Sequence, residues 1–275
     1  MIPRALTAPL ALSALLLCLA SPGEAQRFRG SGGYSTVRVG SGLPDVPGGF
    51  TLCRLAYDSY RNDPSGGGWD TDFPNADRNL PTRLGELTPT PVARWSDGQP
   101  GHAIVRPSDP DLFRCPFLYA TDVGELGFSP DEADAMRTFF LKGGTFWADD
   151  FWGSRAWVDF QREMQRVLPE YAFEEIPRDH PLFRIVYDIL RIPQIPSIQH
   201  WNQSGGGTSE QGADSAIPSM RAIFDEDGRL LVIATHNTDI SDGWEREAED
   251  PRFFSLFSPD AYAIGINIAV WQMTH

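Results

Sequence analysis

The sequence is poor in positive charge: 23 lysines and arginines stand against 37 aspartates and glutamates, which gives a formal net charge of −14 at pH 7. Such an acidic surface repels nucleic-acid phosphates and anionic lipids, so nucleic acid is excluded as a main partner. Several catalytic signatures are also missing, among them the G-x-S-x-G elbow, the H-E-x-x-H pair, the phosphate-binding loop and a cysteine pair at zinc spacing. The glycine-rich stretches do not match the dinucleotide fingerprint, so NAD is not expected.

Apolar runs of membrane-spanning length are missing as well. The stretch 6–20 is apolar and uncharged, but its 15 residues are fewer than the ~20 that a spanning helix needs. Arg4 precedes this stretch and Gly23-Glu24-Ala25 follows it, which is typical of a signal peptide at 1–25 that is cleaved after Ala25. We therefore expect a secreted or periplasmic protein with no membrane span after cleavage. An uncleaved anchor is the alternative.

Cysteine is scarce. Cys53 and Cys115 are the two cysteines that remain after export, in a compartment where a disulfide can persist. Both lie at or beside predicted strands, where the alternative is two small buried side chains. The sequence leaves both possibilities open because it does not fix the geometry of a disulfide. Neither cysteine lies on a strand-to-helix turn, so a thiol nucleophile is not expected.

The rest of the chain predicts one α/β domain. Residues 26–49 are rich in glycine, serine and proline and lack periodicity, which is typical of a flexible lead-in, and a single domain is predicted from 50 to 275. Its strands are expected at 50–57, 116–121, 145–148, 220–224 and 229–235, and its helices at 77–87, 130–142, 157–168 and 259–272. The second of these helices is the clearest, because Ser129 and Glu132 form a predicted capping box.

Alternating strands and helices with short links predict a three-layer sandwich, with a mostly parallel sheet covered by helices on both faces. The turn signal at 225–228 predicts a hairpin between the last two strands and hence an antiparallel edge. Pro193, Pro196 and three consecutive glycines predict a long excursion at 193–219.

Acidic side chains follow most of the predicted strands, at the point where each strand ends. In open α/β sheets, ligands bind beyond the carboxyl ends of the strands, so these side chains are candidates for a common site. The acids expected at this edge are Asp58, Asp70, Asp72, Asp122, Asp149, Asp150 and Asp239. Each of them could instead cap a helix or close a turn. Asp149 and Asp150 are the strongest candidates for ligand, catalytic and metal-binding roles, because two adjacent acids exceed what one cap requires.

Histidine and tryptophan supply the other candidates. His180 could be a ligand-binding or catalytic residue oriented by Asp179, or a loop histidine bonded to backbone. His236 is a candidate metal ligand. Trp69 and Trp244 lie in predicted loops beside acids, as does Trp152, and could stack on a flat ligand or close over the end of the sheet.

A series of short motifs runs along the domain in a fixed order. They are Arg54-Leu55-Ala56-Tyr57, Gly68-Trp69, Asn79-Leu80, Pro116-Phe117-Leu118-Tyr119, Leu141-Lys142-Gly143-Gly144, Asp149-Asp150, His180-Pro181, Asp227-Gly228-Arg229-Leu230, Asp239, Trp244-Glu245 and Gly265-Ile266-Asn267. No single motif is specific. By their order and spacing, the chain from about Phe50 to its C-terminus resembles the bacterial family known as domain of unknown function 4159.

That family is similar in fold to class I glutamine amidotransferases and ThuA-like proteins, so the resemblance implies a flavodoxin-like sandwich. Some members carry membrane anchors and are encoded near MoxR-type ATPases, which implies an envelope role. Amidotransferase chemistry does not carry over, because it needs a cysteine on a strand-to-helix turn, and Asp149-Asp150 stand at the comparable strand end. The chain also departs from the family pattern after the strand that contains Tyr119. The family pattern has Gly-His after this strand, whereas here Ala120-Thr121 is followed by Asp122.

Three functions fit these observations, and the sequence does not decide whether the protein is an enzyme. The favoured one is a non-catalytic binding or envelope-associated module without a cofactor, whose acidic, Trp-lined crevice takes a small polar ligand or an envelope protein. The alternative is a hydrolase that uses a divalent metal held by Asp149, Asp150 and a histidine. A third is an assembly component with a vestigial crevice.

Overall fold

The computed structural model describes residues 49–60 and 66–275, so the predicted signal peptide and nearly all of the lead-in at 26–49 lie outside the described residues. A seven-stranded sheet with the order β3-β1-β4-β6-β9-β8-β7 forms its centre. The strands are β1 (Leu52–Leu55), β3 (His102–Val105), β4 (Phe117–Ala120), β6 (Thr145–Ala148), β7 (Phe173–Glu175), β8 (Ser219–Phe224) and β9 (Leu230–His236). The short strands β2 (Asp58–Ser59) and β5 (Leu126–Gly127) pair separately.

The predicted fold class is confirmed. The neighbouring strands from β3 to β9 run parallel, and β8 is antiparallel to both of its neighbours. The hairpin β8–β9 is the expected one, but β7 adds a further antiparallel strand outside it. A buried parallel strand needs side chains that are apolar on both faces, and β4 and β6 are fully buried stretches of that kind.

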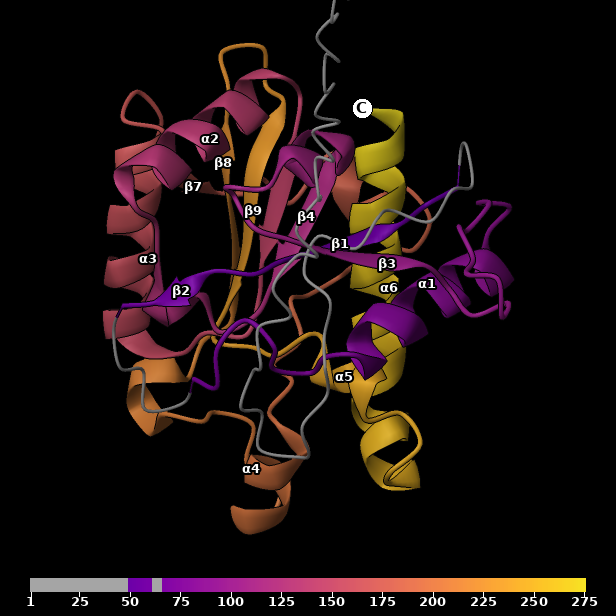
Figure 1. Ribbon diagram of the computed structural model, residues 1–275. Coiled ribbons are helices and arrows are strands. Elements are labelled where there is room, and N and C mark those ends of the chain that lie inside the picture. The colour runs from indigo at the N-terminus through magenta and orange to yellow at the C-terminus, as the bar shows by residue number, and fades with distance from the viewer. Residues whose placement is uncertain (1–48, 61–65) are drawn as a thin grey trace, which may run out of the picture.

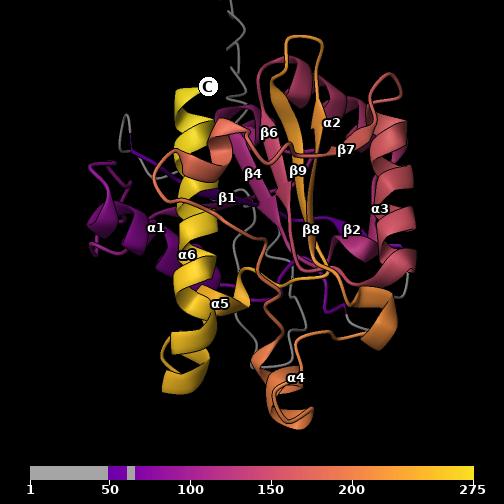
Figure 2. The same cartoon turned by 180° about the vertical axis from the view of Figure 1, so that it is seen from behind.

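Helices cover both faces of the sheet (Figures 1 and 2). They are α1 (Asn75–Leu87), α2 (Pro130–Leu141), α3 (Gly153–Val167), α4 (Ile198–Gln203), α5 (Asp242–Glu245) and α6 (Pro251–Thr274), with short 3₁₀ turns η1 (Pro110–Arg114), η2 (Val123–Glu125), η3 (Pro181–Arg184) and η4 (Gly212–Ser215). Helices α2 and α3 lie on one face, and α1, α5 and α6 on the other. Each face buries its own cluster of apolar side chains.

Helix α2 begins as its sequence predicts. The Ser129 side chain accepts a hydrogen bond from the Glu132 backbone N–H, and the Glu132 carboxylate accepts one from the Ser129 N–H. This reciprocal pair satisfies two backbone donors that the first turn of a helix leaves without partners.

Replacing Ser129 with alanine is therefore expected to lower the free energy of unfolding by about 1 kcal/mol. Urea denaturation measures the effect. The matched control is Ser255→Ala in α6, where the hydroxyl is exposed and only bonds back to the Pro251 carbonyl; its change is expected to stay within about 0.5 kcal/mol. Equal losses in both variants would contradict the role of the cap.

Helices α3 and α6 both begin earlier than their sequences predict. Helix α3 starts at Gly153 rather than at 157. Helix α6 starts at Pro251 rather than at 259, because Asp250 accepts hydrogen bonds from two backbone N–H groups and Pro251 suits the first helical position. The internal Pro259 does not end this helix.

Helix α6 also corrects the expectation that no apolar run after the leader could span a bilayer. Its length and mean hydropathy of 1.3 are sufficient for a span. However, 56% of the tested stretch is buried inside the fold, where α6 packs against α1, α5 and η3. The high hydropathy of α6 is therefore explained by its position as a helix that packs in the core of the fold.

Candidate functional site

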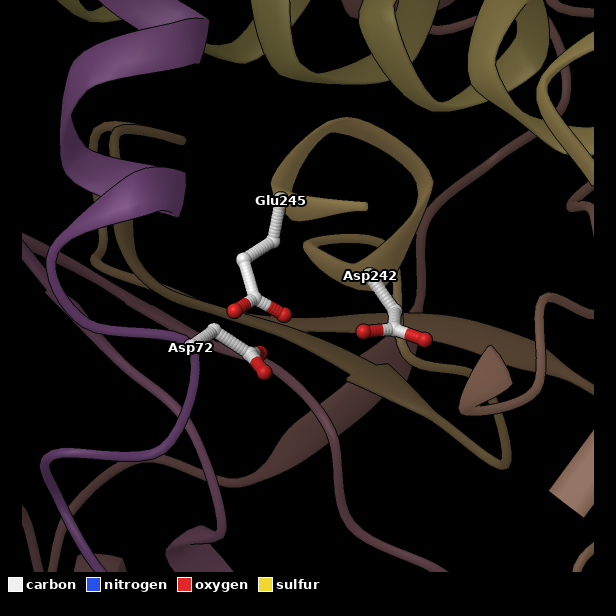
Figure 3. A group of neighbouring side chains, drawn as sticks. All are labelled: Asp72, Asp242 and Glu245. Atoms are coloured by element: carbon white, nitrogen blue, oxygen red, sulfur yellow. The ribbon is translucent and has the colours of Figure 1, made fainter. Parts of the chain in front are cut away.

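Acidic side chains gather where the parallel strands end. The β8–β9 turn lies at the top of Figure 1, so the carboxyl ends of β4, β6 and β9 point toward the bottom, where α4 and α5 lie. Two groups of three carboxylates meet here, each with oxygen atoms within 4.8 Å of one another. One group is Asp72, Asp150 and Asp239, and the other is Asp72, Asp242 and Glu245, whose carboxylates point toward one another in Figure 3. We call these five residues the carboxylate cluster.

Asp72 belongs to both groups and therefore lies at the centre of the cluster. It comes from the loop before α1, whereas Asp150 follows β6 and Asp239 follows β9. The exposed fraction is 9% for Asp72, 7% for Asp150 and 2% for Asp239. Carboxylates from three separate segments of the chain thus converge in a region that is largely shielded from water.

The backbone of this edge is unusual. Among residues 49–60 and 66–275, four non-glycine residues have positive φ, namely Asp72 (64°), Asp122 (54°), Asp150 (51°) and Asn237 (61°). Aspartate and asparagine tolerate the left-handed region better than most residues, yet each such position still costs of order 1 kcal/mol. Two of the four belong to the carboxylate cluster, and Asp122 lies beside it.

Ser241 links Asp149 to the cluster. Its hydroxyl lies 2.7 Å from Asp72 Oδ2 and 3.0 Å from Asp239 Oδ1, and its backbone N–H donates to Asp149 Oδ2. Asp149 also accepts a hydrogen bond from the Thr235 hydroxyl at 2.5 Å. Asp149 is fully buried and its contacts bind β6 to the segment after β9, so it supports the cluster from within the protein.

Burial and repulsion between carboxylates raise the pKa values of Asp150, Asp239, Asp242 and Glu245. Loss of water raises the pKa of Asp150 and Asp239 well above the usual value for aspartate, and neighbouring carboxylates, Asp72 among them, add to the effect. Burial likewise raises the pKa of Asp242 to about 7 and that of Glu245 to about 9. The arginine side chain that contacts these last two is Arg246, whose Nε lies 2.7 Å from Glu245 Oε2 and 3.3 Å from Asp242 Oδ1.

These shifts predict a pH dependence for the metal-free protein. Asp149 and Asp242, both with pKa about 7, and Glu245, with pKa about 9, keep their protons when folded at pH values where unfolded carboxyls have lost theirs. The resulting stability is complete below about pH 4. It is lost as the pH rises from there to each folded pKa, near 7 for Asp149 and Asp242 and near 9 for Glu245, by about 1.4 kcal/mol per pH unit for each proton.

Urea denaturation in chelator between about pH 6.5 and pH 9 is expected to show the part of this decline that belongs to Glu245, because the contributions of Asp149 and Asp242 are lost by about pH 7. His236 acts in the opposite direction, because burial lowers its pKa to about 4, but its contribution is already complete above its ordinary value of 6.5. A free energy of unfolding that stays constant or rises across the window would contradict the shifts.

A buried arginine fixes the loop that carries Asp72. Arg54 in β1 is fully buried and pairs with Asp77 at 2.6 Å. One of its terminal nitrogens donates to the carbonyls of Trp69 and Thr71, at 3.1 and 2.9 Å. These bonds fix the backbone immediately before Asp72.

Asp122 holds the same loop from its other side. Its carboxylate accepts hydrogen bonds from the Gly67 N–H at 2.7 Å and from the Thr71 hydroxyl at 2.5 Å. Burial raises its pKa well above the usual value. The predicted ligand-binding residue Asp122 therefore lies next to the cluster and contacts the loop, while Asp70 of that loop belongs to neither group of three.

The structure separates Asp58 and His180 from the cluster. Asp58 is exposed on β2 and pairs with Arg106 at 3.1 Å. His180 packs its ring on Phe224 and Trp271. Because Phe224 lies opposite Leu230 at the start of β9, His180 is at the far edge of the sheet from the acids.

His236 lies at the carboxyl edge but outside the cluster. Its Nε2 contacts the Gly153 carbonyl at 2.9 Å, and its ring packs against Phe151 and Trp157. Neither group of three includes it.

The three loop tryptophans are buried, which agrees with the alternative that their rings cover the end of the sheet. The exposed fractions of Trp69, Trp152 and Trp244 are 5%, 1% and 1%. Trp152 donates its indole N–H to Asp150 at 2.9 Å, and Trp244 packs on Trp147 and Tyr262. The structure therefore does not present these rings as platforms for a flat ligand.

The sequence interpretation missed Asp242 and Glu245. They follow Asp239 at steps of three, a spacing that puts side chains on one face of a helical turn, and this signal could have identified them. It also missed Arg54, which stands out as a charged residue in an otherwise apolar strand.

Residues 51–273 match the model of a family described as a domain of unknown function (DUF4159). A search of curated proteins gives no match.

Proposed function

We propose, from the premise that this chain belongs to the DUF4159 family, that it is an exported binding module whose carboxylate cluster binds a divalent cation. The observation that carries the proposal is the pair of carboxylate groups that share Asp72, with oxygens within 4.8 Å. A cation held by these carboxylates would supply a positive charge for binding a small polar or anionic ligand.

Electrostatics is the reason to expect a cation at the carboxylate cluster. Carboxylates this close in a shielded region cannot all be ionised, so they either hold protons or surround a positive charge. Side-chain oxygen atoms are the preferred ligands of Ca²⁺ and Mg²⁺, and softer metals prefer nitrogen and sulfur. A hard divalent cation neutralises the cluster without protons.

Cation titration tests this proposal. After treatment with chelator, Ca²⁺, Mg²⁺ or Mn²⁺ is expected to raise the thermal midpoint, corresponding to about 2.7 kcal/mol at a concentration of 100 Kd. The variant Asp72→Asn keeps a residue type that tolerates positive φ but removes the shared charge. It is expected to be more stable than the wild type without metal at pH 8, because repulsion falls, and to lose the stabilisation by metal.

The matched control is Asp134→Asn, which removes one exposed charge from α2. It is expected to respond to cations as the wild type does. A wild type that none of the three cations stabilises, or an Asp72→Asn variant that gains as much as the wild type, contradicts the proposal.

Export is supported by two observations. The sequence of residues 1–25 has the pattern of a cleavable leader, and Cys53 and Cys115 form a disulfide, a bond that persists in oxidising compartments. The disulfide also leaves neither of these sulfurs free as a nucleophile, which favours a binding module over amidotransferase chemistry. The finer relation to glutamine amidotransferase-like and ThuA-like proteins is supported by the parallel sheet with helices on both faces.

A metal-assisted hydrolase is the second candidate, and one observation favours it. Asp72 is common to both carboxylate groups, as a bridging ligand is in two-metal hydrolytic sites. Calorimetric titration separates the candidates: two cations per chain together with metal-dependent hydrolysis of a phosphate or carboxylate ester favour the hydrolase. One cation without turnover favours the binding module.

A further inference from the structure

A second hollow lies away from the carboxylate cluster, at the antiparallel end of the sheet. It has a volume of about 440 Å³ and is formed by α3, η4, β7, β8 and the end of β9. Among its walls are Trp157, Glu174, Glu175, Asp214, Arg221 and His236. Pockets of roughly 300–1,000 Å³ accommodate small organic ligands, so the hollow is large enough for one or two sugar rings.

His236 offers a hydrogen-bond acceptor in this hollow. Its residue is 5% exposed, and its Nε2 lies 2.9 Å from the Gly153 carbonyl, which can only accept. The proton of the neutral ring is therefore on Nε2, and Nδ1 keeps a free lone pair. Burial lowers the pKa of His236 to about 4, so the ring stays neutral at physiological pH. Within the part of the chain that the structure describes, no residue donates to Nδ1.

The charges of the hollow are unequal, with three carboxylates facing one guanidinium. Arg221 is held at one wall, because its Nε lies 2.7 Å from Glu175 Oε1 and its Cζ lies 4.3 Å from the centre of the Trp157 ring. Among the described residues, no arginine or lysine is paired with Glu174 or Asp214, and Asp214 accepts hydrogen bonds from the backbone N–H and the hydroxyl of Ser154. The walls thus present excess negative charge, a neutral acceptor and aromatic surface.

We propose that this hollow is a binding site for a small polyhydroxylated cation of the amino-sugar class. The ammonium group pairs with the excess carboxylates, and the hydroxyl groups donate hydrogen bonds to His236 and Glu175. A metal ion is not the occupant, because neither of the two metal-sized groups in the described residues includes a side chain from these walls.

Isothermal titration of the full mature chain with glucosamine, and with glucose as the uncharged counterpart, tests the proposal. Glucosamine is expected to bind at least about fivefold more tightly than glucose. The variant Glu175→Gln is expected to weaken glucosamine binding about fivefold, because it removes a carboxylate. The variant Arg221→Gln is expected to strengthen it by a similar factor, because it removes the competing cation.

The test is specific because the two variants are expected to change glucosamine affinity in opposite directions. Glu175 is exposed and Arg221 is partly exposed, with side-chain fractions of 62% and 28%, so both variants are expected to fold, as circular dichroism verifies. The matched control Glu86→Gln removes one exposed charge from α1 on the other face of the sheet and is expected to bind glucosamine as the wild type does. Absence of glucosamine binding, equal binding of glucose, or shifts of the same sign in both hollow variants overturns the proposal.

Discussion

Replacing Arg54 with methionine is expected to lower the free energy of unfolding by about 3–5 kcal/mol, because it leaves the Asp77 carboxylate buried without its counter-charge. Both side chains are fully buried, and the guanidinium makes three contacts of 2.6–3.0 Å with Asp77. Methionine retains most of the apolar stem, so the loss reflects charge rather than packing. Urea denaturation at pH 7 measures it.

The double variant Arg54→Met/Asp77→Leu separates the ion pair from the positioning of the loop. Removing both charges is expected to restore most of the lost stability, since apolar replacements of buried ion pairs are often neutral. Cation stabilisation is expected to stay weak, because the carbonyls of Trp69 and Thr71 no longer receive the hydrogen bonds from Arg54 and the loop before Asp72 is held less firmly. A double variant that is stable and binds cations as the wild type does would show that Arg54 does not position Asp72.

The acids at the strand ends could be predicted from the sequence, because parallel strands all end at the same edge of the sheet. Asp149, Asp150 and Asp239 each follow a buried strand and meet at that edge, where Ser241 links Asp149 to Asp239 and Asp150 lies beside Asp239. Asp58 also follows a strand but lies on the separate pair β2–β5, where it faces Arg106. Position at a strand end therefore predicts the edge of the sheet and not the direction of the side chain.

The rest of the cluster depends on contacts that are distant in sequence. Asp72 comes close to Asp242 because Arg54 and Asp122 fix its loop, and these partners stand 18 and 50 residues away from it. His180 is a residue for which the local motif was misleading. It has a polar neighbour in sequence, but in the fold it packs on Phe224 at the edge of the sheet opposite to the acids. Local patterns predict where elements begin and end, whereas the convergence of loops depends on the packed structure.

The disulfide is the other long-range link on which the fold depends. Cys53 in β1 and Cys115 before β4 are 62 residues apart, and both are buried. The segment that they close contains β3, which is the edge strand of the sheet, together with α1 and the loop that carries Asp72. The bond thus constrains the whole section of the chain that brings Asp72 to the acids after β6 and β9.

Replacing both cysteines with alanine is expected to lower the free energy of unfolding by about 4 kcal/mol, because a cross-link over 62 residues removes that much entropy from the unfolded chain. Alkylation of the unreduced protein in denaturant, read by mass spectrometry, is expected to leave Cys53 and Cys115 unmodified.

Denaturation in reductant provides the control, because the unfolded wild type then also lacks the cross-link. The wild type and the double variant are then expected to differ only by the two lost thiols, which isolates the effect of packing from that of the bond. Equal differences with and without reductant would assign the loss to packing alone. A difference that appears only under oxidising conditions would instead place the effect in the unfolded chain, whose freedom in the segment 53–115 the bond restricts.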